Sequence, residues 1–359
     1  MGFATSEGGA VRERLGMFDA SPSRPMGSRS VLGVLPSGGS RGAGFAARKF
    51  GAPLLLLLML LLGLRELLFH ARGSGANPAR DAERQGRYEA MGAGFRERGL
   101  DVAGMDTSRV ALWATAENRL PAGPLKARQF PAGRADRFAA LALPMLVAVR
   151  ADEAAGQVVE ALDRALGLGA ADAAASGLRV YRTPPEAMHT TLFFHARQDG
   201  SGRPGGDSIW WEESAWWQSA ATNLLGGSVE LRVDDLVVAP SGVILLLLGD
   251  PGDALEPLRD AAAAKWEGKA PGRQTRLIAH VSLARVLSLP VPPPAAGEHL
   301  EGRHSAELTA EQVAGVDAAC EQAVEGIKGL RFHADAVWYV QLESADLLHR
   351  AYERRVPLQ

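Results

Sequence analysis

Apolar positions between residues 141 and 342 follow two spacings. Short continuous or alternating apolar runs predict strands, whereas apolar residues three or four apart predict helices. The pattern predicts strands over Leu141–Val149, Leu178–Thr183, Met188–His195, Val229–Val238, Val243–Leu248, Leu277–Val286 and Arg331–Leu342. It predicts helices over Asp152–Leu168, Ile209–Leu225, Ala254–Trp266 and Ala306–Ile327.

Strands and helices follow one another in an irregular order, which is typical of an α+β domain with mixed sheets. Pro240-Ser241-Gly242 separates two apolar runs and predicts a hairpin between them. We therefore expect one domain over residues 140–349, followed by a short C-terminal tail over 350–359.

The first 139 residues differ from the rest of the chain in amino-acid composition. Residues 1–49 are rich in Gly, Ser and Arg, a composition that cannot bury a core, and we expect them to be disordered. Residues 50–69 are apolar and long enough for one hydrophobic helix. Residues 70–139 are polar and Gly- and Pro-punctuated, which indicates a stalk or linker with a short helix over Ala79–Glu97.

The apolar segment over 50–69 has three interpretations. It is a single-pass signal anchor in an endomembrane, or a cleaved secretory or organellar targeting sequence, or a buried helix of a soluble domain. A leader of fifty residues is long for a signal peptide, and a Leu-rich helix without a polar face is unusual in a soluble core. Both observations favour the anchor, with the membrane as the partner of residues 50–69.

Charge and cysteine content narrow the classes of partner and site. Residues 140–359 hold 19 Lys and Arg against 29 Asp and Glu, a net charge of −10, so this domain would repel a long polyanion. We expect a monomer that binds a small nucleotide or an RNA end rather than long nucleic acid. Cys320 is the sole cysteine, which excludes an intramolecular disulfide and a cysteine-rich zinc site.

Two short motifs carry the candidate chemistry. His189 is followed at the second position by Thr191, and His280 is followed in the same way by Ser282, each in a strand-like apolar run. Residues i and i+2 of a strand point to the same face, so each motif places an imidazole beside a hydroxyl. Two such strands facing each other would surround one phosphate-sized anion. The alternative is a pair of core histidines on buried strands.

The paired H-x-T and H-x-S motifs, with Thr183–Pro185 before the first and Gln274–Arg285 around the second, resemble the two-histidine phosphoesterase superfamily. Plant and algal proteins of the RNA ligase/cyclic nucleotide phosphodiesterase family are similar over residues 140–348. The resemblance implies a bilobal α+β fold, in which two mixed or antiparallel sheets flank a central cleft. It also implies a phosphodiesterase acting on a 2′,3′-cyclic or related cyclic phosphate, or on an RNA-terminal or 2′-5′ diester.

Two histidines can supply one general base and one general acid near neutral pH, while Thr191 and Ser282 hydrogen-bond phosphate oxygens. This chemistry needs no metal or cofactor, and none is expected. His195 is interpreted as a structural or rim residue. Arg276 is expected on the His280 face of its strand, whereas strand alternation places Arg285 on the other face. Residues that could contact a substrate are Arg276, Tyr181, Phe194, Trp338 and Tyr339.

Two other functional classes remain open. The same fold could be a nucleotide-binding module without turnover, which intact histidines and hydroxyls argue against. The chain could also be a membrane-tethered scaffold, in which case the motif pair is a coincidence. Turnover of a small phosphodiester, and its loss in histidine variants, separates these classes from the enzyme.

Overall fold

The computed structural model describes residues 78–101, 113, 125, 127–130, 134–168, 178–197, 200–202, 206–225, 227–273, 278–288, 308–345, 347 and 350–358. The predicted disordered segment 1–49 and the hydrophobic segment 50–69 lie outside these residues. Within the described part of the chain, no helix is long and apolar enough to cross a membrane.

Helices and strands together confirm the α+β class. The described α-helices are α2 (Pro78–Arg98), α4 (Met145–Ala165), α6 (Asp207–Leu225), α7 (Leu255–Lys265) and α8 (Ala310–Glu325), with the short 3₁₀ helix η1 (Pro185–Ala187). The strands are β1 (Asp136–Ala142), β2 (Leu178–Arg182), β3 (His189–Ala196), β4 (Val229–Val238), β5 (Val243–Gly249), β6 (Gly272–Arg273), β7 (His280–Ser288), β8 (Arg331–Ala334), β9 (Ala336–Leu342) and β10 (Arg350–Pro357).

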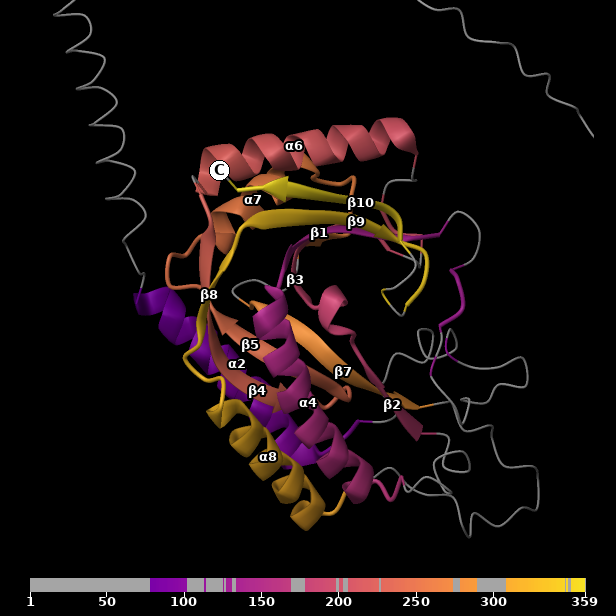
Figure 1. Ribbon diagram of the computed structural model, residues 1–359, viewed down its shortest axis with the longest axis vertical. Helices are drawn as coiled ribbons and strands as arrows, with labels where there is room; N and C mark the ends of the chain where they lie inside the picture. The colour runs from indigo at the N-terminus through magenta and orange to yellow at the C-terminus, as the bar shows by residue number, and fades with distance from the viewer. Residues whose placement is uncertain are drawn as a thin grey trace, which may run out of the picture. The chain divides into compact units, whose positions relative to one another are not determined.

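The strands form one curled antiparallel sheet in the order β10-β9-β1-β3-β7-β5-β4-β8, with β2 also pairing with β7 and β6 with β3 (Figure 1). The expectation of two sheets is therefore wrong for the described strands, whereas the antiparallel alternative holds for all their pairings. The sheet is narrowest between β3 and β7, which share a single register pair, Thr190 with Val281. Only Asp335 separates β8, which ends the strand order on one side, from β9, the second strand from the other side.

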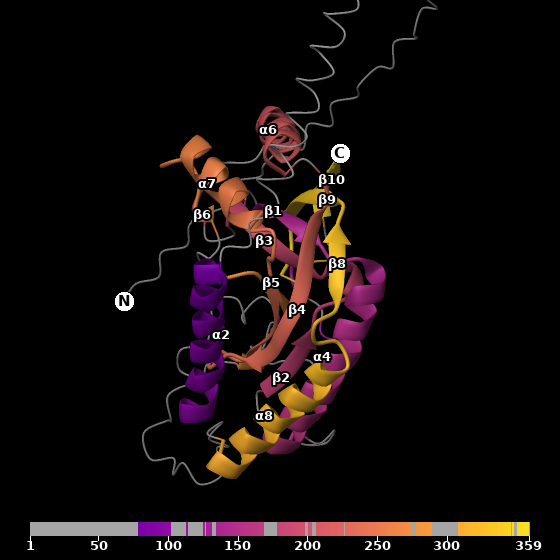
Figure 2. The ribbon, with the colours of Figure 1, turned by 90° about the vertical axis from the view of Figure 1, so that its left-hand side faces the viewer.

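Each half of the sheet has its own helices. Helices α4 and α8 pack together against the half that contains β4, β5 and β7, and α2 covers the opposite face of that half (Figure 2). Helices α6 and α7 pack against the half that contains β1, β3, β9 and β10. The predicted hairpin is present as β4 and β5, and Gly242 supplies the positive φ of 75° at its turn.

Three predicted elements differ from the structure. The apolar run Leu141–Val149 is not one strand, because Pro144 ends the extended segment and caps the start of α4. The predicted strand Arg331–Leu342 is divided into β8 and β9, which pair at opposite ends of the strand order. Helix α8 begins after Thr309, whose side chain forms a capping box with Gln312, rather than at residue 306.

The predicted domain limits of 140 and 349 are too narrow. Helix α2 lies in the segment interpreted as a stalk, yet its Phe95 is buried in the main core and its Tyr88 is buried against the sheet. Strand β1 begins at Asp136, four residues before the predicted limit. The predicted tail forms β10, which pairs with β9 along its whole length. Helix α2 and strand β10 are rich in charged residues, which is why their composition resembles that of a linker or a tail.

Candidate active site

The two histidine motifs lie side by side at the junction of the two half-sheets. His189 begins β3 and His280 begins β7, and the central residues of the motifs, Thr190 and Val281, are the register pair that joins these antiparallel strands. An antiparallel pair has a local twofold axis between its strands. The two motifs are therefore related by an approximate local twofold rotation.

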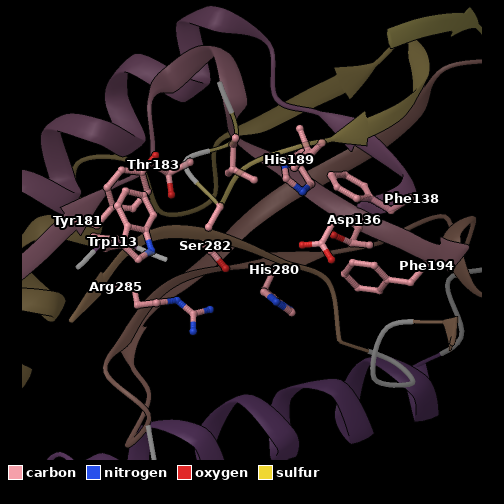
Figure 3. A pocket seen from close by; sticks show the side chains of 15 residues that line it. Trp113, Asp136, Phe138, Tyr181, Thr183, His189, Phe194, His280, Ser282 and Arg285 are labelled. Atoms are coloured by element: carbon pink, nitrogen blue, oxygen red, sulfur yellow. The ribbon is translucent and has the colours of Figure 1, made fainter. Parts of the chain in front are cut away.

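All four motif side chains line one cavity of about 220 Å³ (Figure 3). His189, Thr191, His280 and Ser282 share this cavity, so the structure brings the predicted catalytic and phosphate-binding residues together. His189, His280 and Ser282 are half-buried, and Thr191 is buried.

A β-bulge follows each motif and changes which later residues face the cavity. The pairing of β1 with β3 skips Leu192, and the pairing of β5 with β7 skips Leu283. An extra residue reverses the alternation of the strand beyond it. As a result, the residue five positions after each histidine lines the cavity: Phe194 after His189, and Arg285 after His280. The expectation that Arg285 points away from His280 is wrong for this reason.

His189 has a well-defined orientation. Its Nδ1 lies 2.7 Å from the carbonyl oxygen of Ala187, and this oxygen can only accept, so Nδ1 carries the proton. Phe138 stacks on the imidazole at 4.9 Å between ring centroids, and Trp338 contacts its edge at 5.3 Å. The tautomer leaves Nε2 as the nitrogen that can exchange a proton with a ligand.

Burial makes both histidines weak bases. Desolvation lowers the pKa of His189 to about 4. The hydrogen bond to Ala187 acts in the opposite direction, and the nearby charge of Arg350 lowers the pKa further. Desolvation likewise lowers the pKa of His280 to about 4, and the charges of Arg259 and His189 add to the effect. Both rings are therefore neutral at pH 7 in the protein alone.

The cavity is also lined by residues that lie outside the two motifs and were not predicted from the sequence. Asp136 and Phe138 come from β1, before the predicted domain limit, and Trp113 comes from the predicted stalk. Trp113 packs on Tyr181 with 4.2 Å between ring centroids. Figure 3 shows this pair on one side of the motif residues and Phe138, Phe194 and Asp136 on the other. A single aromatic residue in a polar segment carries no spacing signal that could have pointed to the cavity.

The candidate substrate contacts fall into three groups. Tyr181 and Phe194 line the cavity, so their contact with a substrate stays a prediction. Trp338 is fully buried behind His189, and its Nε1 donates to Glu353, so it supports the imidazole rather than the cavity wall. Tyr339 is buried on the opposite face of the sheet, where its hydroxyl binds Glu213, and that placement is inconsistent with substrate contact. Arg276 lies outside the described residues.

His195 belongs to a buried polar network on that opposite face, consistent with a structural role. Trp217 donates to its Nε2 at 2.8 Å, and its Nδ1 lies 3.4 Å from Glu213. Arg137 makes two hydrogen bonds to Glu213, at 2.7 and 3.2 Å. Burial would raise the pKa of Glu213, but its contacts with His195 and Arg137 lower it to about 2. The carboxylate therefore stays ionised beneath the sheet.

Metal ligands do not gather in the part of the chain that the structure describes: no group of three His, Cys, Asp or Glu side chains is close enough to hold an ion there. His299 and His304, near several glutamates in the sequence, lie outside that part. Cys320 is buried on α8, where desolvation raises the pKa of its thiol to about 12.

Comparison with solved structures gives distant likenesses in fold, among them two bacterial proteins. No protein-family model and no curated protein matches the sequence. The chain is similar to TT0787 of Thermus thermophilus at 17% identity and a TM-score of 0.34, over 62% of this chain and 97% of that one. It is similar to ATU0111, a conserved protein of unknown function from Agrobacterium tumefaciens str. C58, at 14% identity and a TM-score of 0.37, over 64% and 90% of the two chains. Scores this low support no conclusion about function.

Proposed function

We propose that this chain is a metal-independent phosphodiesterase with a bilobal two-histidine phosphoesterase-like architecture. Its substrate is a 2′,3′-cyclic or related cyclic nucleotide phosphate, or an RNA-terminal or 2′-5′ phosphodiester. The observation that carries the proposal is the shared cavity of the two H-x-[ST] motifs, which come from adjacent strands and are related by a local twofold axis.

In this reaction one histidine removes a proton from the attacking water, or from a substrate hydroxyl, as the new P–O bond forms. The other histidine gives a proton to the departing oxygen as the old P–O bond breaks, so the pair exchanges one proton for another. Thr191 and Ser282 donate to the non-bridging oxygens, and Arg285 supplies the cationic group of the cavity wall. The steps need only the protein's own acids and bases.

The low pKa values fit this scheme once a ligand is bound. A general acid must be protonated, and both histidines are neutral in the empty cavity at pH 7. A phosphodiester remains a monoanion across this pH range, and an anion beside an imidazole favours its charged form. Substrate binding would therefore raise the pKa of the histidine pair. One histidine would then take up the proton that it later gives to the departing oxygen.

The test is turnover by the full chain on 2′,3′-cyclic nucleotides, ADP-ribose cyclic phosphate and 2′-5′ dinucleotides, with and without EDTA. We expect hydrolysis that EDTA leaves unchanged. We also expect kcat to fall by about 10²–10⁴ in His189→Ala and in His280→Ala. The double variant should be little worse than the poorer single one, since the pair acts as a unit.

His333→Ala is a matched control, because this imidazole is 61% exposed on β8 and does not line the cavity. Near-normal turnover in either cavity variant would exclude the two-histidine mechanism. Loss of activity on chelation, restored by a divalent ion, would exclude metal independence. A wild-type chain that binds a nucleotide through both histidines without turnover would instead be the binding module.

A further inference from the structure

Tyr88 of helix α2 makes a polar contact immediately beside the second motif. Its ring is buried against β4 and β5, in a cluster with Leu245 and Leu247. These two leucines are the cross-strand partners of Ser282 and His280. The hydroxyl lies 2.7 Å from the carbonyl oxygen of Leu248 and 2.9 Å from that of Ala279, the residue before His280.

The hydroxyl replaces one rung of the ladder between β5 and β7. Leu248 N–H donates to the Ala279 carbonyl at 2.9 Å, but the reciprocal bond runs through the tyrosine. Ala279 N–H donates to the Tyr88 oxygen at 3.1 Å, and Tyr88 O–H can then donate to the Leu248 carbonyl. One donor and one acceptor on the hydroxyl satisfy two buried backbone groups.

Helix α2 is attached to this half of the sheet by further polar contacts along the same side. Arg80 forms an ion pair with Asp253, and Gln85 donates to Asp234 at 2.9 Å. Arg84 is buried and reaches the carbonyl oxygen of Asp250. The helix therefore holds the hydroxyl in a fixed position relative to β5.

We propose that Tyr88 is a positioning residue for His280, and that helix α2 is thereby part of the active unit. Without the hydroxyl, the Ala279 N–H and the Leu248 carbonyl lose their common partner in a site that water does not reach. These two backbone groups can then hydrogen-bond to each other only if the start of β7 moves toward β5. That movement displaces His280, which is the next residue, whereas His189 on β3 is held by Ala187 and its aromatic neighbours.

The kinetic part of this inference rests on the proposed function, so the decisive measurement is independent of turnover. Tyr88→Phe is made in the full chain, and the imidazole signals of His189 and His280 are followed by NMR through a pH titration. Tyr352→Phe is the matched control, because it removes an exposed tyrosine hydroxyl that binds Asp207 away from the cavity.

In Tyr88→Phe we expect the His280 signal and its titration midpoint to shift, while the His189 signal stays as in the control. On an active substrate, kcat should fall by about 10- to 100-fold with a smaller change in KM, because misplacing a catalytic group costs rate more than binding. 4-Aminophenylalanine at position 88 keeps a donor and an acceptor at the same place. It should restore most of the wild-type behaviour. If the Phe chain does not fold, 3-fluorotyrosine at position 88, which keeps the hydroxyl but changes its hydrogen-bond strength, should give a smaller shift of the same His280 signal, and no shift would overturn the inference.

An unshifted His280 signal in a folded Tyr88→Phe chain would overturn the inference, even if the free energy of unfolding were lower. Tyr88 would then be a structural residue only. If the wild type turns over no substrate but the His280 signal shifts as expected, the positioning role stands and the proposed function fails.

Discussion

Sulfate binding would report the charge state of the two cavity histidines. Sulfate is a phosphate-shaped dianion whose own charge does not change between pH 5 and 7, so a change in its affinity over this range comes from the protein. In the empty cavity desolvation holds the pKa of both histidines at about 4. An anion between the rings stabilises the imidazolium form, so we expect binding to be linked to proton uptake.

The size of the effect follows from the pKa values of one histidine in the two states. We take about 4 for the empty cavity and the ordinary value of about 6.5 for the complex, in which the anion offsets the desolvation. Linkage then gives an affinity about 20-fold higher at pH 5 than at pH 7 for a single proton taken up. The sign is fixed by the direction of the shift: a histidine whose pKa rises on binding favours binding at lower pH.

Titration calorimetry of the full chain with sodium sulfate at pH 5, 6 and 7 measures this affinity, with chloride holding the ionic strength constant. Buffers of different ionisation enthalpy give the number of protons taken up. Because either ring can take up the proton, replacing both His189 and His280 by Gln should remove most of the pH dependence, whereas His333→Gln should keep it. An affinity that is the same at pH 5 and pH 7 in the wild type would refute the reasoning from desolvation.

Four other outcomes are expected. The pH optimum of kcat/KM, which reports the free enzyme, should lie below that of kcat, and coincident optima would contradict the low pKa values. Thr191→Ala and Ser282→Ala should lower kcat less than the histidine changes and raise KM, as steady-state kinetics would show. Glu213→Gln should lower the free energy of unfolding by about 3–5 kcal/mol in urea titrations, because it removes the negative charge that faces the buried guanidinium of Arg137. Glu230→Gln, in an exposed pair, should cost at most about 1 kcal/mol. The full chain should stay with membranes through an alkaline carbonate wash if residues 50–69 span the bilayer, and recovery of a soluble form starting near residue 70–80 would show a cleaved presequence.

The cavity could be predicted from sequence where one rule, strand alternation, was enough. Alternation over three residues places His189 with Thr191 and His280 with Ser282, and the structure has both pairs on one cavity. The same rule fails beyond Leu192 because a bulge depends on how a strand pairs with its neighbour. No pattern within a single strand contains that information.

Domain limits were missed for a different reason. Composition separates segments that bury much apolar surface from those that bury little, and α2 and β10 belong to the second kind. Helix α2 is attached by Tyr88 and by charged side chains such as Arg84, which bind backbone oxygens more than 150 positions away. Strand β10 is mostly exposed and is held by backbone pairing with β9. Polar segments with distant partners look like linkers in a sequence.

The differences between the two motifs are as informative as their symmetry. A twofold pair of histidines cannot by itself decide which ring meets the nucleophile and which meets the leaving group. The position five residues after each histidine breaks the symmetry, with apolar Phe194 on one side and cationic Arg285 on the other. The supports also differ, since Arg259 donates to the Thr191 carbonyl whereas Tyr88 bridges to Ala279. In the proposed reaction these unequal neighbours are what would orient an asymmetric diester.

An Arg285→Phe exchange should therefore weaken the preference for one scissile bond more than it weakens phosphate binding. Product analysis on a 2′,3′-cyclic nucleotide would measure this loss of preference as a changed ratio of 2′- to 3′-phosphate. An unchanged ratio would mean that the orientation comes from elsewhere in the cavity.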